Sequence, residues 1–117
     1  MTADDPVKYG GTGKGPSSFG LMSAALASCT TMTLRMYAER KKLDLRSSTV
    51  RVSHAKIHAE ECADGESTGG KNDEFQREQL LYGNLTAQER QRLLEIADMC
   101  PIHHAFHAEV TVRTTAR

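Results

Sequence analysis

Cysteine and histidine are the residues of this sequence best suited to chemistry. The chain holds three cysteines and five histidines. They are Cys29, Cys62, Cys100, His54, His58, His103, His104 and His107. A cysteine thiolate is a nucleophile and a metal ligand, and a neutral imidazole is a common metal ligand. Thiol chemistry and metal binding are therefore the two kinds of site to weigh.

Cys100 has the most favourable local setting for a reactive thiol. Pro101 ends the preceding helix, because the residue before a proline is pushed out of the helical region, and proline suits the first position of a new helix. Cys100 is therefore predicted to open a short helix over Pro101–Phe106. Free backbone N–H groups and the positive end of a helix dipole favour the thiolate there. A purely structural role in a buried corner explains the pattern equally well.

The other two cysteines have weaker local settings. Cys29 lies within an uncharged run, Phe19–Leu34, near the middle of a predicted helix. Local structure does not activate a thiol there, so Cys29 needs a basic neighbour supplied by the fold, and the alternative is a small core residue. Cys62 has neither a helix start nor a proline beside it, so we expect it to be dispensable for thiol chemistry.

A metal site is the weaker interpretation of these residues. Cys100 and the three histidines after it are close in sequence, but a zinc finger needs a second ligand pair at matched spacing, which is absent. His54, His58 and Cys62 would span about 27 Å along a strand, too far for one ion. We therefore expect no metal and no cofactor, and a zinc-binding structural module is the least favoured alternative. The stretch GGTGKGPSS also lacks the spacing of a phosphate-binding loop.

The composition predicts one small soluble domain over residues 1–117, with residues 1–15 as a loop-like arm. Fifteen basic and fifteen acidic residues give a net charge of zero, so neither nucleic acid nor a membrane surface is expected as a partner. An odd number of irregularly spaced cysteines suits a reducing compartment. The polar first residues do not resemble a secretory signal. These features together predict a cytoplasmic protein.

The longest predicted element is a helix over Ser18–Lys41, with Ser17 or Ser18 as its N-cap. It would be roughly 36 Å long. Its apolar residues Phe19, Met22, Leu26, Met32 and Met36 are separated by alanines and serines. A helix that is apolar nearly all round is a buried helix. The rest of a chain this short cannot cover it, which predicts a homodimer.

The remaining pattern predicts strands over Ser48–Glu60 and Asp73–Tyr82, joined by a polar loop over 61–72. The apolar phase changes after Val52, which suggests a bulge near Ser53 and His54. A helix over Leu85–Met99 begins with a capping box of Thr86 and Glu89. Alternation of Ala108, Val110 and Val112 predicts a final strand. This order of elements favours the α+β class.

Two stretches resemble a known family. GPSSFGLMSAALASCTTMTLRMYAERK is similar to the central helix of the OsmC/Ohr family of thiol peroxidases, and LLEIADMCPIHHAF is similar to its second signature. GGTGKGP resembles the family's loop before the helix, and HAEEC, residues 58–62, resembles a motif of one short OsmC-like branch. The resemblance covers roughly residues 4–115. The two cysteine motifs are specific together, whereas either alone would be weak.

The resemblance implies an α+β, OsmC-like fold, in which two long central helices pack against antiparallel β-sheet in an intertwined homodimer. It implies reduction of organic or inorganic hydroperoxides, with Cys29 as the peroxide-attacking residue and Cys100 as the resolving residue. A sulfenic acid on the first cysteine would condense with the second to a disulfide, which an external thiol or dithiol would reduce.

Two features depart from the family pattern. An activating arginine usually comes from a hairpin before the central helix, but residues 1–15 are too short for that hairpin and contain no arginine. Gly20 stands where many members carry an acidic residue, and Arg35 lies near the face of the helix opposite Cys29. A non-enzymatic binder of small molecules, or a redox sensor, therefore stays open as an alternative, although retention of both cysteines opposes it.

Overall fold

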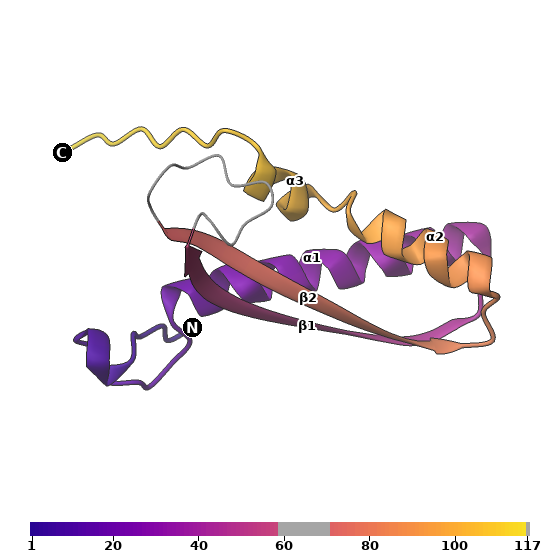
Figure 1. Ribbon diagram of the computed structural model, residues 1–117, viewed down its shortest axis with the longest axis horizontal. Coiled ribbons are helices and arrows are strands. Elements are labelled where there is room, and N and C mark those ends of the chain that lie inside the picture. The colour runs from indigo at the N-terminus through magenta and orange to yellow at the C-terminus, as the bar shows by residue number, and fades with distance from the viewer. Residues whose placement is uncertain (59–70, 117) are drawn as a thin grey trace.

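The computed structural model describes residues 1–58 and 71–116. The elements are a 3-10 helix η1 (Val7–Tyr9), helix α1 (Ser18–Lys41), strand β1 (Leu45–His58), strand β2 (Lys71–Gly83), helix α2 (Ala87–Ala97) and helix α3 (Pro101–His107). The α+β class is confirmed. Figure 1 shows both strands running along α1, and α2 and α3 lie against the same helix. Every other element is thus arranged around α1.

Helix α1 has the predicted bounds. It begins because the hydroxyl of Ser17 accepts a hydrogen bond from the backbone N–H of Gly20 at 3.1 Å. It ends at Lys42, whose left-handed conformation (φ 56°) lets the chain turn toward β1. Its bounds therefore follow from its caps.

Burial of α1 within the single chain is limited to one side. Its buried residues are Leu26, Thr30, Leu34 and Ala38, a single stripe at four-residue spacing. Met32 and Met36 on another side are 64% and 69% exposed. The chain's own strands and helices therefore cover only the stripe, and burial of the other side by a second chain stays a prediction.

β1 and β2 form a two-stranded antiparallel sheet. The predicted bulge near Ser53 and His54 was wrong: both pair in regular register, and the irregularity lies between Leu45 and Ser47 instead. The physical reason is that His54 occupies a helix-facing position, where its ring stacks on Phe19 with centroids 4.1 Å apart. The apparent change of phase arose from counting His54 as an outward polar residue.

α2 packs on α1 as its apolar face predicts. The capping box is confirmed, with Glu89 N–H donating to Thr86 Oγ1 at 3.0 Å and Thr86 N–H donating to Glu89 Oε1 at 2.8 Å. The core holds Leu34, Ala38, Leu45, Leu93, Ile96 and Ala97. This packing brings the C-terminal end of α2 against the middle of α1.

The predicted final strand is absent from the described residues. Residues 108–116 form no helix or strand, and Figure 1 shows them leading away from the sheet. Val110 and Val112 are largely exposed. Alternation makes a segment suitable for a sheet, but a strand forms only against a partner strand, and none of the described residues pairs with this segment.

Within residues 1–58 and 71–116, none of the helices combines the length and the hydrophobicity needed to cross a membrane.

Candidate active site

Cys100 lies where the sequence predicted it, between α2 and α3. Its side chain is fully buried, and its Sγ accepts a hydrogen bond from the backbone N–H of His103 at 3.2 Å. The same Sγ is 3.8 Å from Thr30 Oγ1 in α1. Cys100 is therefore the N-cap of α3 and also a contact to the middle of the central helix.

Cys29 precedes Thr30 in α1 and is partly exposed. Consecutive helical residues point about 100° apart, so Cys29 and Thr30 look out of different sides of the helix. Cys29 shares its side with Met22 and Met36, seven residues away in either direction. The fold thus brings Cys100 against the residue next to Cys29, and both thiols are free. Because α2 packs on α1, we expect the two sulfur atoms to lie within roughly 10 Å of each other in the reduced protein.

Cys62, which we expected to be dispensable, lies outside the described residues.

A cation that the sequence analysis missed lies beside Cys100. Arg77 in β2 donates from one guanidinium nitrogen to Thr30 Oγ1 at 3.2 Å and to the carbonyl oxygen of Ala97 at 3.3 Å. Its other nitrogen donates to Asp98 Oδ1 at 2.6 Å. The Arg77 side chain is only 13% exposed. We call Thr30, Arg77, Asp98 and Cys100 the Arg77 cluster.

One signal could have identified Arg77. Arg77 and Phe75 are two residues apart in β2, so both side chains project to the helix-facing side of the sheet. A charged residue at a core-facing strand position requires a partner. Arg77 has such a partner in Asp98, so an arginine–carboxylate pair lies beside Cys100.

His103 stands at the edge of the Arg77 cluster. Burial lowers the pKa of its imidazole below the ordinary value, and the positive charge of Arg77 lowers it further. The carboxylate of Asp98, 3.9 Å from His103 Nδ1, acts in the opposite direction. The net effect favours the neutral ring, which can accept or donate a proton.

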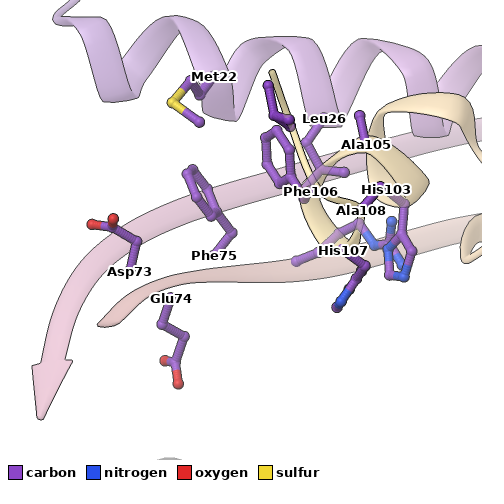
Figure 2. A pocket seen from close by; sticks show the side chains of 12 residues that line it. Met22, Leu26, Asp73, Glu74, Phe75, His103, Ala105, Phe106, His107 and Ala108 are labelled. Atoms are coloured by element: carbon purple, nitrogen blue, oxygen red, sulfur yellow. The ribbon is translucent and has the colours of Figure 1, made fainter. Parts of the chain in front are cut away.

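A cavity of about 500 Å³ adjoins this cluster. Its apolar walls are Met22, Leu26, Phe75, Ala105, Phe106, Ala108 and Val110, and its polar residues are Asp73, Glu74, Arg77, His103 and His107. Figure 2 shows Phe75 and Phe106 between α1 and the strands, with the carboxylates of Asp73 and Glu74 turned away from them. Leu26 is one helical turn from Cys29. Neither Cys29 nor Cys100 lines the cavity itself, and Leu26 is the lining residue nearest to Cys29 in sequence.

A second polar group lies at the other end of the cavity. Asp73 accepts hydrogen bonds from His54 Nε2 at 2.8 Å and from Lys56 Nζ at 3.0 Å. The hydrogen bond from His54 and, to a smaller extent, the hydrogen bond from Lys56 hold the pKa of the Asp73 carboxyl below its usual value. The His54 ring stacks on Phe19 and also contacts Phe75, whose ring contacts Phe106. We call His54, Lys56 and Asp73 the His54 cluster.

The described part of the chain contains no group of three or more histidine, cysteine or carboxylate side chains arranged to hold a metal ion. The rings of His103 and His107 contact each other at a tilt of 42°, with centroids 4.7 Å apart. Their contact is therefore explained by packing.

Comparison with known proteins places the chain in a family. Residues 11–115 match the family described as OsmC-like protein. Among curated proteins, no relative matches the sequence significantly.

Solved structures share the fold at low identity. A Psychrobacter arcticus 273-4 protein, named for osmotic stress induction and a detoxification response, has a TM-score of 0.69 at 21% identity, covering 88% of this chain and 69% of that one. The organic hydroperoxide resistance protein OsmC of Legionella pneumophila has a TM-score of 0.66 at 22% identity, covering 88% and 70%. An organic hydroperoxide resistance protein of Elizabethkingia anophelis, with thiocyanate bound, has a TM-score of 0.66 at 22% identity, covering 86% and 68%. The family match and the shared fold agree: this chain belongs to the OsmC-like protein family.

Proposed function

We propose that this chain is a cysteine-based hydroperoxide reductase in which Cys29 attacks the peroxide and Cys100 resolves the product. The observation that carries the proposal is the contact of buried Cys100 with Thr30, the residue next to partly exposed Cys29 in α1. Family membership supports the reaction class, as do relatives named for organic hydroperoxide resistance.

The proposed reaction has three steps. The thiolate of Cys29 attacks one peroxide oxygen, the O–O bond breaks, and the alcohol leaves with a proton while Cys29 becomes a sulfenic acid. The thiol of Cys100 then attacks the Cys29 sulfur, forming the S–S bond and releasing water. An external thiol or dithiol reduces the disulfide and restores both cysteines.

The apolar walls of the cavity favour an organic hydroperoxide over hydrogen peroxide. Bringing an alkyl or aryl group against Met22 and Phe75 removes apolar surface from water, which contributes about 25 cal/mol for each Å². Hydrogen peroxide offers no such surface. We therefore expect the ratio kcat/KM to be higher for cumene hydroperoxide than for hydrogen peroxide.

The working form in this proposal is a homodimer in a reducing compartment such as the cytoplasm, with one long central helix from each subunit. Exposed methionines on α1 support this assembly, since Met32 and Met36 form an apolar side that the single chain leaves open. Sedimentation at micromolar concentration should give the mass of two chains, and Met36→Glu should shift the equilibrium toward monomer. A monomeric parent protein would contradict the assembly.

Peroxide consumption tests the activity directly. Reduced protein is mixed with cumene hydroperoxide or hydrogen peroxide in the presence of a dithiol, and peroxide loss is followed over time. We expect turnover that Cys29→Ser abolishes and that Cys62→Ser leaves within a few-fold of the parent. No consumption of either peroxide would favour a non-enzymatic binder or redox sensor. Equal loss in both variants would mean that the site lies elsewhere.

A further inference from the structure

Arg77 joins three elements that meet beside Cys100. From β2 it donates to Thr30 of α1 and to Ala97 and Asp98 at the C-terminal end of α2. A guanidinium offers five N–H donors in a rigid plane, so these bonds fix the relative positions of the elements. Lysine, with a flexible stem and one charged nitrogen, could not satisfy all three partners in the same way.

Thr30 is the point at which Arg77 and Cys100 meet. Its hydroxyl donates to the carbonyl oxygen of Leu26 at 2.7 Å. One lone pair accepts from Arg77 at 3.2 Å, and Cys100 Sγ lies 3.8 Å from the same oxygen. A hydroxyl has one donor and two acceptor lone pairs. The oxygen of Thr30 therefore has one lone pair left for the S–H of Cys100.

The backbone before Cys100 is held by the same arginine. Arg77 bonds the carbonyl oxygen of Ala97, which also accepts the backbone N–H of Cys100 at 3.3 Å. Asp98, two residues before Cys100, is 62% exposed and pairs with Arg77. Arg77 thus ties the backbone before Cys100 to β2, and Thr30 ties the side chain of Cys100 to α1.

We propose that Arg77 is the positioning residue for Cys100, holding its sulfur beside α1 so that the disulfide with Cys29 closes rapidly. The proposal rests on the proposed pairing of Cys29 with Cys100. Arg77 touches neither the peroxide nor the reacting sulfur in this role. It acts through Thr30 and the end of α2, and its contribution is orientation, for which small misplacements cost large factors in rate.

A two-step thiol exchange measures how fast the disulfide between Cys29 and Cys100 forms, and it needs no peroxide. In Cys62→Ser protein, the aromatic disulfide dithionitrobenzoate reacts with the accessible thiol of Cys29, forming a mixed disulfide and releasing one thionitrobenzoate. The thiol of Cys100 then attacks the Cys29 sulfur, forming the protein disulfide and releasing a second thionitrobenzoate and a proton. Absorbance separates the two releases, and Cys100→Ser should show the first release only.

Arg77→Met should slow the second release about tenfold or more while leaving the first within about twofold. Arg77→Lys should restore part of the rate, because it keeps a cation beside Asp98. Arg92→Met is the matched control: this exposed arginine pairs with Glu95 at 2.9 Å and should change neither release. Asp98→Asn, at a largely exposed position, serves if Arg77→Met fails to fold, and should slow the second release about threefold.

The outcomes separate the inference from the proposed function. Unchanged second release in Arg77→Met and Asp98→Asn would overturn the inference. So would equal slowing of both releases, or slowing that Arg77→Lys does not relieve, since either would indicate a general structural role. Absence of peroxide-dependent sulfenic acid on Cys29, tested by dimedone trapping in protein that carries both Cys62→Ser and Cys100→Ser, would remove the proposed function, because no resolving thiol competes with dimedone there. The exchange measurement would still decide the role of Arg77.

Discussion

Two polar clusters, each with one residue on β2, use similar residue types in different surroundings. The Arg77 cluster is held around a guanidinium that is 13% exposed and bonded to three elements. The His54 cluster is more open, with the amine of Lys56 53% exposed and a carboxylate, Asp73, that is 40% exposed. Both lie at the same cavity, because Asp73 and Arg77 are both among its lining residues.

The comparison shows that partner number and burial, more than charge, decide what a polar group contributes. Loss of Arg77 would remove three hydrogen bonds, to Thr30, Ala97 and Asp98, and a typical hydrogen bond contributes about 0.5–1.5 kcal/mol. Lys56 makes a surface ion pair, typically worth less than about 1 kcal/mol. The aromatic stacking of His54 on Phe19 gives the His54 cluster its main structural role.

Arg77→Met should have the largest effect on stability. The methionine side chain has similar length but removes the hydrogen bonds that Arg77 donates to Thr30, Ala97 and Asp98, so the free energy of unfolding should fall by about 2 kcal/mol. Urea denaturation at one fixed protein concentration measures it, since assembly would make stability depend on concentration. A loss below about 0.5 kcal/mol would contradict the comparison.

Acid should destabilise the protein through His103. Burial lowers the folded-state pKa of its imidazole, so between that pKa and the unfolded value of about 6.5 the unfolded state binds more protons. Stability therefore rises with pH through this window and falls as the solution is acidified. His103→Gln should flatten the slope of unfolding free energy against pH below about 6.5. An unchanged slope would show that His103 is not its source.

Asp73 should change the stability of the protein at lower pH than His103 does, and by a smaller amount. Its folded-state pKa lies below the usual value, so its contribution is present above about pH 4 and is lost as pH falls through the folded value. Asp73→Asn should lower stability slightly at neutral pH and leave it unchanged at the acid end. Thermal denaturation at several pH values checks this, with Glu74→Gln as a neighbouring control.

Lys56→Met should have the smallest effect. The ammonium group is exposed and its partner Asp73 keeps the hydrogen bond from His54, so the unfolding free energy should change by less than about 0.5 kcal/mol. A loss comparable with that of Arg77→Met would remove the distinction between the two clusters.

Local rules predicted the elements that carry local signals. The caps of α1 and α2, and the proline after Cys100, are short-range features, and the structure has them as predicted. The α+β class followed from the order of the elements, and the apolar face of α2 accounts for its packing on α1. The Cys-Pro sequence likewise predicted that Cys100 lies at the start of α3.

What could not be predicted depends on contacts between distant segments. Arg77 and His54 occupy helix-facing positions, but a pattern that counts charged residues as outward assigns them to solvent. Their partners, Asp98 and Phe19, are far away in sequence and near only because β2 and β1 pass beside α1. The strand expected at Val110 depends on a partner strand, which alternation of residues cannot supply.

The buried stripe of α1 has a geometric consequence for the thiols. Four residues advance a helix by about 400°, so a stripe at that spacing turns about 40° at each step. From Leu26 to Ala38 it turns by about 120°, whereas Met22, Cys29 and Met36 remain nearly in line along the axis. The covered and open sides are therefore adjacent at the N-terminal half of α1 and almost opposite at the C-terminal half. Cys29 lies where they begin to separate, which leaves its thiol within reach of the chain's own core and of the solvent side at once.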